Sequence, residues 1–521
     1  MSEKNTQLKM LTGRLSAEPV FLFWQNILEA FPGSECFLVG GAVRDAILNR
    51  PSKDYDFIVR GVKAEALQEF LSSIGIVNLV GRTFGVFKFV PLIQYEDFKV
   101  AGLEPFDIAL PRTEQAGFSG GYKDFNVQSD SHLPIEKDLE RRDFTMNAMA
   151  VRLIGMRGQG SGVSGELIDP FRGAEDIEKK NIRAVGKPED RFQEDYSRML
   201  RALRLACELE FEIEERTFRT IENMASSLND KQNGDWVVPR ETIAKEFLRG
   251  FFAAPVRAFD LCDTSGVFHA LLPEVIRMKH CPQPPEYHAE GDVFVHTRLA
   301  LQKLESAEYQ KIFSAGKPDA ETVMAVLFHD IGKPPTMRTP EEHGTDRIRF
   351  DEHPEVGADI VRVIVRRLKL DSQPSASPLH VSEDHLAWLI KNHLLLLHGD
   401  PKEMRASTVE KYFFNPLAPG DTLMRLAWCD GSATIPASGA PDLSSFQAMR
   451  LRIDEVGRQA KFRGKLPPPL LDGVIIMETL HLEPGPRVGE IIRLLREEQL
   501  EGRLATREEA IIFINKLPKT V

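Results

Sequence analysis

The hydrophobic pattern divides the chain into a mixed N-terminal part and a longer helical part. Apolar residues at helical spacing predict an amphipathic helix over 16–31. Short apolar runs typical of β-strands follow at 54–59, around 86–90 and at 106–110, with a helical stretch over 64–74 among them. Helices and mixed strands in this order predict a small α+β head.

Two polar segments interrupt this head, and both are expected to be loops. Residues 117–132 are rich in Gly, Ser, Asn and Asp, which is typical of a mobile loop. The run GQGSGVSG at 158–165 is expected to be a surface insertion between two strands.

From about residue 175 nearly to the end, apolar residues recur with a period near 3.6, which predicts mostly α-helix. One helix is expected over 488–500, and Thr506 with Glu509 predicts a capping box at the start of the last helix. The pattern breaks at four places that are candidate loops or boundaries: 229–235, 281–286, 371–378 and 436–445.

Composition and charge exclude few classes of protein. Hydrophobic residues make up 42% of the chain and charged residues 27%, which is ordinary for a soluble globular protein. No run reaches the roughly 18 apolar residues of a membrane span, and the N-terminus lacks the apolar core of a secretory signal. The five cysteines are scattered without a CxxC pair, so reduced thiols in a cytoplasmic protein are expected. A net charge of −11 argues against a protein that coats nucleic acid, but it is compatible with a local basic groove.

Asp54 and Asp56 form the first candidate catalytic group. Residues two apart in a strand point to the same face, so DYDFIV presents both carboxylates together. Two such carboxylates repel each other unless a cation lies between them, and hard oxygen ligands favour Mg²⁺. Asp107, in FDIAL, is placed to be a third carboxylate, although a solvated strand residue fits equally well. Bound Mg²⁺ would activate a 3′-hydroxyl and stabilise a departing pyrophosphate. Alone, a DxD pair is more often an exposed strand than a metal site.

A glycine pair precedes these aspartates in LVGGAVRD. Gly40 and Gly41 fall at a strand-to-helix turn, where backbone amides can hold a triphosphate. Arg44 lies within the first helical turn and could reach the same phosphates.

Five motifs in a fixed order resemble those of the class II CCA-adding enzymes and bacterial poly(A) polymerases, which are polymerase-β-like nucleotidyltransferases. The motifs are LVGGAVRD, DYD, DLERRDFTMNAMA, LIDPFRGAEDI and RFQEDYSRMLRALR. The resemblance is strong over 36–211 and extends over the remainder at domain level. It implies template-independent addition of CTP and ATP to the 3′ end of tRNA, in synthesis or repair of the CCA end.

The resemblance also implies roles for single residues. Asp54 and Asp56 would hold the metals, and Arg142 would bind the nucleotide while Asp143 and Asn147 order the ribose and the site. The nucleotide-binding set implied for the head is Gly40, Gly41, Arg44, Arg142, Asp143 and Asn147.

Glu194, Asp195 and Arg198 correspond to a protein template that reads the Watson–Crick edge of CTP or ATP in this family. An arginine fork and a carboxylate supply fixed donors and acceptors for a base edge. Tyr196 and Ser197 stand where the family commonly has Pro-Leu, a departure that bears on base selection. Four charged residues at a spacing of three form a stripe on one predicted helix: Asp195, Arg198, Arg201 and Arg204. Instead of binding nucleotide, this stripe could be a solvated helix face with salt bridges.

Two segments bear on the specificity within the family. GRTFGVFKF at 81–89 resembles the CCA-adding form, whereas poly(A) polymerases tend to be basic there. The segment 111–125 is similar to the loop of the HD-bearing CCA-adding enzymes and is full length. CCA addition is therefore the leading interpretation, followed by A-only addition and then polyadenylation.

A second constellation, H…HD…D, resembles the HD superfamily, in which helices bring imidazoles and carboxylates to a divalent metal. A lone histidine in an apolar stretch is usually a core residue, but here six candidates occur in family order. Lys333 follows where the family often keeps a basic residue for phosphate. The resemblance implies a phosphohydrolase, and imidazole-rich sites favour Ni²⁺, Co²⁺, Mn²⁺ or Fe²⁺ over Mg²⁺. The candidate ligands are His296, His329, Asp330 and Asp430, with His353 and His393 for a second metal.

The predicted organisation is a polymerase-β-like head followed by a mostly helical neck, an HD domain and a C-terminal helical unit. Its expected partners are tRNA, CTP and ATP without a membrane, and the oligomeric state stays open. Two other classes, an HD signalling hydrolase with an inert head and a non-catalytic RNA-binding protein, are disfavoured because both sets of catalytic residues are complete. The expected bounds are an N-terminal helical extension at 1–35, the head at 36–174, the neck at 175–285, the HD domain at 286–435 and the C-terminal unit at 455–521.

Overall fold

The computed structural model divides the chain into two compact units, which are described separately. Unit 1 comprises 1–253 and 260–271, and unit 2 comprises 254–259 and 272–521. The residues that the structure describes are 3–80, 86–92, 104–116, 125–154, 164–314, 316–397, 400–462, 468–500 and 502–517.

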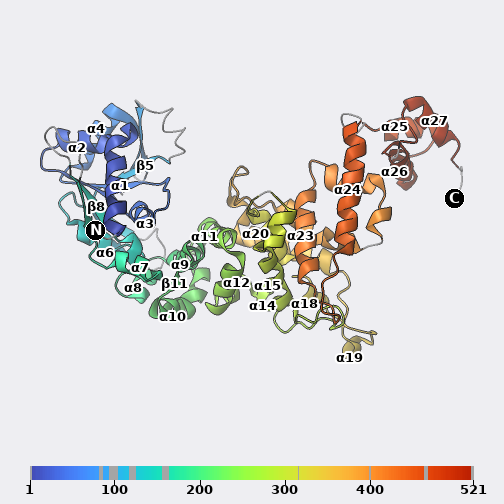
Figure 1. The fold of residues 1–521 in the computed structure, drawn as a ribbon, viewed down its shortest axis with the longest axis horizontal. Helices are drawn as coiled ribbons and strands as arrows, with labels where there is room; N and C mark the ends of the chain where they lie inside the picture. Colours follow the sequence, from blue (N-terminus) through green and yellow to red (C-terminus); the bar gives the residue numbers. More distant parts are fainter. Residues whose placement is uncertain are drawn as a thin grey trace. The chain divides into compact units, whose positions relative to one another are not determined.

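Unit 1 is built around a sheet in which, among the described residues, seven strands follow the order β3-β4-β5-β2-β1-β8-β9. The pair β2–β5 is parallel and the other pairs are antiparallel. Helices α1, α2 and α4 gather around this sheet at the blue end of the chain (Figure 1). The strands are β1 (Glu35–Val39), β2 (Asp56–Arg60), β3 (Gly75–Val80), β4 (Val86–Pro91), β5 (Phe106–Ala109), β8 (Ala150–Ile154) and β9 (Ser164–Ile168).

The two faces of the sheet carry different cores. On one face, Phe37, Val39 and Ile58 pack with Leu139 of α6 (Ile135–Glu140). On the other face, an aromatic layer joins the N-terminal segment to the central strands. Its members are Phe21, Phe23, Tyr55, Phe57, Phe89 and Phe106, with ring centroids 4.9–6.3 Å apart in the contacting pairs.

The expected strands at 86–90 and 106–110 are confirmed by β4 and β5, and the helix at 64–74 by α4 (Ala64–Ile74). The single helix expected over 16–31 is wrong, because Pro19 opens a separate 3₁₀ turn and the helix α2 begins only at Phe23. A further helix, α1 (Glu3–Ala17), precedes this turn.

Two expectations about the head are corrected in part. Strand β2 begins at Asp56, so Asp54 lies just before the strand that was expected to carry both aspartates. Residues 125–129 are not loop, because β7 (Phe125–Ser129) pairs with β6 (Arg112–Ala116). Of the rest of the loop expected at 117–132, residues 130–132 lie outside strands and helices, and 117–124 lie outside the described residues. The last two residues of the insertion expected at 158–165 belong to strand β9, and 158–163 lie outside the described residues.

Helices follow the sheet within unit 1. Two of them, α9 (Ser197–Leu209) and α11 (Arg240–Ala253), pack against each other along their length. Helix α9 buries an apolar stripe that includes Met199, Leu203 and Ala206, and of its arginines Arg204 is buried as well. This stripe explains how a helix rich in arginine is held against the domain.

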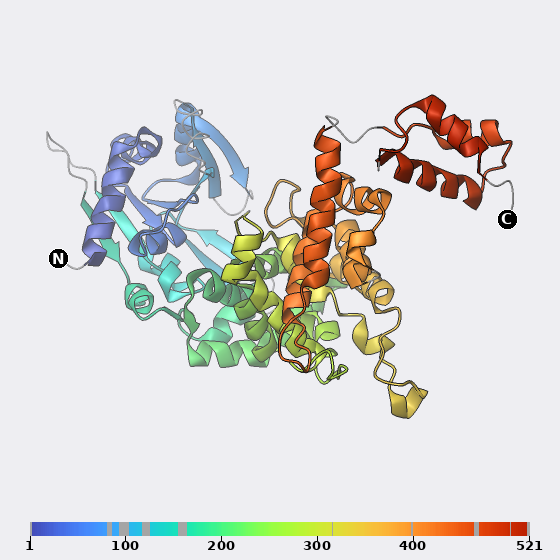
Figure 2. The ribbon, with the colours of Figure 1, turned by 45° about the vertical axis from the view of Figure 1, so that its right-hand side comes forward.

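Unit 2 is helical over its described residues, and its colours run from yellow-green to red in Figure 2. The HD residues lie in, or within two residues after, five helices: α15 (Val293–Leu304), α17 (Ala320–Phe328), α20 (His353–Leu368), α21 (Glu383–Asn392) and α23 (Gly420–Ala433).

The C-terminal helices have a small core of their own around Ile476, Ile491 and Ile514. The expected capping box of Thr506 and Glu509 is confirmed at the start of α27 (Arg507–Asn515). Helix α26 (Pro486–Leu500) begins two residues before the expected 488. No helix among the described residues is long and apolar enough to cross a membrane.

Candidate functional site

Three aspartates meet at one end of a cavity of about 950 Å³ in unit 1. Asp56 and Asp107 are direct neighbours across the parallel pair β2–β5, so their side chains share one face of the sheet. Asp54 also lines the cavity, two residues before Asp56. Asp107 is additionally paired with Lys88, whose Nζ lies 2.8 Å from its Oδ1. The register therefore brings the three predicted carboxylates together.

The electrostatics of this group favour a bound cation. Burial is the main reason that the pKa of Asp56 is raised to about 6; Arg142 opposes this rise, and the charges of Asp54 and Asp107 add to it. Burial also raises the pKa of Asp54, with Glu104 and Asp107 adding to the effect. Crowded, partly desolvated carboxylates are the donor set that a hard divalent cation neutralises best. The residues present therefore fit such a cation.

A tight turn stands next to these carboxylates. Gly40 has a φ of 75°, and a Cβ at this position would lie only 2.7 Å from Nη1 of Arg142, so a side chain is excluded. Gly41 then begins helix α3 (Gly41–Ile47). Arg44 donates from Nη1 to Oδ1 of Asn147 at 2.7 Å, which links two of the predicted nucleotide-binding motifs. All five of these residues line the cavity.

Asp138, which the sequence reasoning missed, organises the arginines of the cavity. Its side chain is fully buried and accepts hydrogen bonds from Arg141 at 2.8 Å and Arg142 at 3.4 Å, and from the backbone N–H of Arg112 at 3.3 Å. Burial alone would raise the pKa of Asp138, but the neighbouring guanidinium groups of Arg141 and Arg142 outweigh it and lower the pKa. The spacing of Asp138 three and four residues before two arginines was the available signal.

Asp143 ties the head to helix α9. Its Oδ2 lies 2.7 Å from Nε of Arg201, and its Oδ1 accepts from the backbone of Phe144 and from Nδ2 of Asn147 at 3.1 Å. Although burial opposes ionisation, Arg201 and Arg198 lower the pKa of Asp143. Arg201 is thus engaged by a carboxylate of the protein.

The predicted template residues lie at the start of α9. Oδ1 of Asp195 accepts from the backbone N–H of Ser197 at 2.9 Å, which leaves its other oxygen for a ligand. Nη1 of Arg198 is held by Glu194 at 2.6 Å, and Nη2 donates to the carbonyl of Arg141 at 3.3 Å. Among the described residues, Asp195, Ser197 and Arg198 line the cavity, whereas Glu194 and Tyr196 do not. Of the two residues that stand in place of the family's Pro-Leu, Ser197 therefore lines the cavity.

Arg204 joins α9 to α11. Its Nε lies 2.5 Å from Oε2 of Glu246 on α11, and its Nη1 lies 2.8 Å from Oε2 of Glu208. The side chain is 7% exposed, so this double ion pair is largely shielded from water. Arg204 also lines the cavity, but its guanidinium is occupied by the ion pairs with Glu208 and Glu246.

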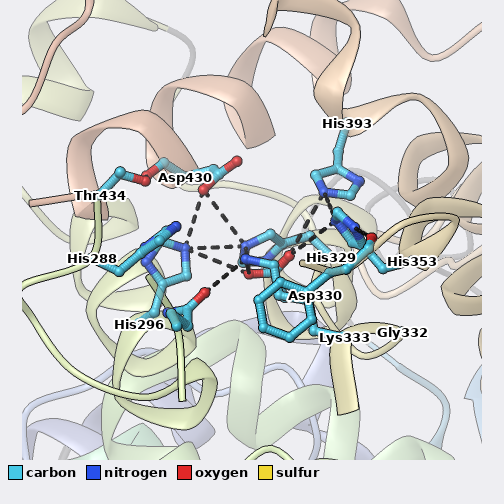
Figure 3. A network of polar contacts seen from close by, with 12 residues as sticks. His288, His296, His329, Asp330, Gly332, Lys333, His353, His393, Asp430 and Thr434 are labelled. Carbon is cyan, nitrogen blue, oxygen red and sulfur yellow. Dashed lines mark hydrogen bonds and ion pairs between the residues drawn. The ribbon is translucent and has the colours of Figure 1, made fainter. Parts of the chain in front are cut away.

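A second cluster lies in unit 2, where the six predicted HD residues come together in two groups (Figure 3). In the picture the imidazoles of His296 and His329 point toward Asp430, and those of His353 and His393 point toward each other. We name His296, His329 and Asp430 the first group, and Asp330, His353 and His393 the second group; within each group the potential ligand atoms lie within 4.8 Å of one another.

Asp330 faces both groups. Its Oδ1 lies 3.6 Å from Nε2 of His353 and 3.7 Å from Nε2 of His393. Its Oδ2 lies 3.3 Å from Nε2 of His329 and 3.9 Å from Nε2 of His296. One carboxylate is therefore placed to bridge two positions.

Three of the four histidines are oriented by backbone carbonyls. Nδ1 of His329 donates to Val326 at 2.8 Å, Nδ1 of His353 to Phe350 at 2.7 Å, and Nδ1 of His393 to Ile390 at 2.6 Å. A carbonyl only accepts, so each Nδ1 carries the proton and each Nε2 keeps its lone pair for the cluster. Burial lowers the pKa of His393 to about 3 and also lowers that of His353, which keeps both rings neutral. The donor set of neutral imidazoles and carboxylates fits a divalent transition metal.

His296 is oriented differently, by a carboxylate that the sequence reasoning missed. Oε1 of Glu290 accepts from Nδ1 of His296 at 2.8 Å and from Nδ1 of His288 at 2.7 Å, and Oε2 accepts from the backbone N–H of Ile435 at 2.9 Å. Burial opposes ionisation of Glu290, but these three donors lower its pKa to about 2. Burial likewise opposes a charge on His296, yet Asp430 and Glu290 raise its pKa to about 9. The raised pKa of His296 means that its surroundings favour a positive charge.

The second cluster opens into a cavity of about 540 Å³. Asp330, His353, His393 and Asp430 lie on its wall. Lys333 is engaged with the cluster itself, because its Nζ lies 2.7 Å from Oδ2 of Asp330 and 2.8 Å from Oε1 of Gln283. The cavity is also lined by cationic and aromatic side chains: Arg347, Arg349, Tyr287, Phe350 and Phe446.

Two family profiles match the chain. The Poly A polymerase head domain matches 36–183, and the HD domain matches 296–414. An A-adding tRNA nucleotidyltransferase of Deinococcus radiodurans is 30% identical over 490 residues, covering 92% of this chain and 94% of that protein. A multifunctional CCA protein of Nitrosococcus oceani is 32% identical over 355 residues, covering 67% of this chain and 74% of that protein.

Solved structures share the fold. The CCA-adding enzyme of Bacillus stearothermophilus in complex with CTP superposes with a TM-score of 0.58 at 19% identity, covering 96% of this chain and 98% of that chain. The CCA-adding enzyme of Thermotoga maritima in complex with tRNA gives a TM-score of 0.55 at 18% identity, covering 97% and 98%. At these identities the likeness concerns the fold.

Proposed function

The chain belongs to the family of tRNA nucleotidyltransferases that carry a poly(A) polymerase head domain and an HD domain, and on that premise we propose that it completes the CCA end of tRNA from CTP and ATP. The observation that carries this proposal is one cavity whose wall includes both the three carboxylates and the pair Asp195–Arg198. We also propose a cytoplasmic location, which tRNA, CTP and ATP as substrates support.

The head would catalyse nucleotidyl transfer with its own side chains and bound Mg²⁺. Asp54, Asp56 and Asp107 would hold Mg²⁺, which supplies charge neutralisation for the attacking 3′-oxygen and the leaving pyrophosphate. Arg44 and Arg142 would contact the triphosphate, and the missing side chain at Gly40 leaves Arg142 room to do so.

The start of α9 would select the base. Asp195 offers one free carboxylate oxygen as an acceptor, and the guanidinium of Arg198 is held in a fixed orientation by Glu194. The carboxylate of Asp195 can accept, and the guanidinium of Arg198 can donate, hydrogen bonds to the Watson–Crick edge of a base. Because both side chains are already held in place, base binding does not have to order them. Ser197 is the third residue of this segment on the cavity wall.

A-only addition is the second candidate. It is favoured by the relative from Deinococcus radiodurans, which is named an A-adding enzyme and aligns with 92% of this chain. CCA addition is favoured by the multifunctional CCA proteins and by the full-length segment at 111–125, most of which lies outside the described residues.

Three tRNA substrates separate these candidates. We would incubate the protein and Mg²⁺ with tRNA lacking CCA, CA or A, and with labelled CTP and ATP. Completion of all three ends supports CCA addition, and extension only of the end that lacks A indicates an A-adding enzyme. Absence of extension on every substrate contradicts nucleotidyl transfer.

For the HD domain we propose a metal-dependent phosphohydrolase. His296, His329 and Asp430 would hold one metal, and His353 and His393 a second, with Asp330 bridging the two. When bound at these residues, a divalent metal would supply an activated water molecule for phosphoester hydrolysis. Imidazole-rich sites favour Ni²⁺, Co²⁺ or Mn²⁺ over Mg²⁺. Arg347 on the cavity wall is available to neutralise a phosphate.

The hydrolase is tested with 2′,3′-cyclic AMP and a generic phosphomonoester in the presence of each metal. Wild type should turn over at least one of them. The double variant His329→Ala/Asp330→Ala should lose this turnover, since two ligands at one helix end are removed. Turnover that survives in the double variant contradicts the assignment of the site.

A further inference from the structure

The two ligand groups of the HD cluster differ in the charges that surround them. We propose that Glu290 makes the first group the tighter of two metal sites, so that divalent metals load in order, first at His296–His329–Asp430 and then at Asp330–His353–His393. This inference rests on the proposed metal-binding function of the HD domain.

Glu290 gives the first group a partner that the second group lacks. Among the four histidines of the cluster, His296 alone donates Nδ1–H to a carboxylate, whereas the other three donate to backbone carbonyls. A carboxylate partner fixes the tautomer of the imidazole and raises its basicity toward a metal on the other nitrogen. The side chain of Glu290 is only 2% exposed, so water screens its charge poorly.

Glu290 also holds two ligand-bearing elements in register. Its Oε2 accepts from Ile435, just beyond the end of α23, and the backbone of Ala289 donates back to the carbonyl of Ile435 at 2.7 Å. Helix α23 carries Asp430, whose Oδ1 lies 3.1 Å from Nε2 of His296. The two ligands are therefore positioned before a metal binds, which reduces the ordering cost of binding.

The second group attracts a cation less strongly than the first group does. Among its described residues, Asp330 is the one carboxylate, and Lys333 places an ammonium 2.7 Å from Oδ2 of Asp330. His353 and His393 contribute no charge. Once the metal has displaced the proton of His296, the first group combines the negative charges of Asp430 and Glu290, whereas the charge of Asp330 is largely offset by Lys333. A dication therefore gains more electrostatic energy at the first group.

The number of potential ligand atoms also favours tighter metal binding at the first group. Oδ2 of Asp330, which also contacts Nζ of Lys333, lies 3.3 Å from Nε2 of His329 and 3.9 Å from Nε2 of His296, so Asp330 can add a fourth donor to the first position once it releases Lys333. The second position has three donors, of which Asp330 is shared. More donors and more negative charge at the first position together predict sequential loading.

We would titrate the metal-free full chain with Ni²⁺ by calorimetry, and follow Co²⁺ binding by its visible absorption. Wild type should bind two ions, the first at least about 10-fold more tightly than the second. Glu290→Gln should weaken the tight class by about 10- to 100-fold and leave the weak class within about two-fold, as loss of an outer carboxylate does at other metal sites. Glu308→Gln, at an exposed position of α16 (Ala307–Ile312), is the matched control and should bind as wild type does.

A second variant keeps the test independent of the stability of Glu290→Gln. His353→Ala should lose only the weak class, and loss of the tight class instead overturns the proposed order. Two classes of equal affinity in wild type, or an unchanged tight class in a folded Glu290→Gln protein, also overturn it. If wild type binds no metal, the proposed function of the HD domain fails with it, and this outcome differs from all of the others.

Discussion

Asp138 illustrates at the scale of one residue how a buried carboxylate arranges the cations of the transferase cavity. It contacts Arg141, Arg142 and the backbone of Arg112, and all three of these residues line the cavity that holds the three aspartates. Residues that hold the arginines are therefore as important for the site as the arginines themselves.

Asp138→Asn should destabilise the protein by about 3 kcal/mol at neutral pH, because two guanidinium groups lose their buried counter-charge. The lowered pKa of Asp138 means that its stabilisation is present above the ordinary aspartate pKa near 4 and is lost as the pH falls below it. Urea unfolding from pH 7 to pH 3 should thus show the difference between wild type and variant shrinking toward acid. A constant difference would contradict this role.

Arg198 is the residue on which base selection should depend most. Arg198→Ala should reduce the preference for CTP and ATP over GTP and UTP by about 1–3 kcal/mol, the usual range for a base contact, and change triphosphate affinity less. Single-turnover kinetics with all four nucleotides measure both effects. Unchanged relative efficiencies would count against the template role.

At the scale of elements, the helix at 64–74 and the strands at 86–90 and 106–110 followed from hydrophobic periodicity, because each buries one regular face. Helix α1 did not, since its sequence is mostly polar and its apolar stripe is short, with the buried leucines Leu8, Leu11 and Leu15. The candidate metal ligands could be predicted from sequence motifs, but the contact of Glu290 with His296 and Ile435 could not. Its partner Ile435 is 145 residues away, and only the tertiary structure brings the two together.

The contact between α9 and α11 gives a prediction at this scale. Arg204→Met should cost about 3 kcal/mol, because it leaves Glu208 and Glu246 largely buried without that partner. Arg249→Met is the matched control, since Arg249 also pairs with Glu208 but is 37% exposed, and it should cost less than about 1 kcal/mol. Thermal unfolding compares the two, and equal losses would contradict the importance of the buried pair.

At the scale of the whole molecule, the two clusters belong to different compact units and differ in chemistry. Carboxylates dominate in unit 1, and imidazoles with two aspartates dominate in unit 2. The two proposed activities should therefore depend on different residues and different metals.

The double variant His329→Ala/Asp330→Ala should retain nucleotide addition with Mg²⁺ at close to the wild-type rate, because no residue of its cluster lines the transferase cavity. Ni²⁺ should support the hydrolase better than the transferase, in line with the preferences of imidazole and carboxylate ligands. Parallel loss of both activities in a folded double variant would refute the separation of the two sites.

The most direct measurement is the incorporation of labelled CMP and AMP into tRNA that lacks its CCA end, by wild type and by Asp56→Ala. The account predicts that wild type with Mg²⁺ adds three nucleotides and that Asp56→Ala adds none while retaining the hydrolase activity of the HD domain. Nucleotide addition by Asp56→Ala at the wild-type rate, or none by wild type, would contradict it.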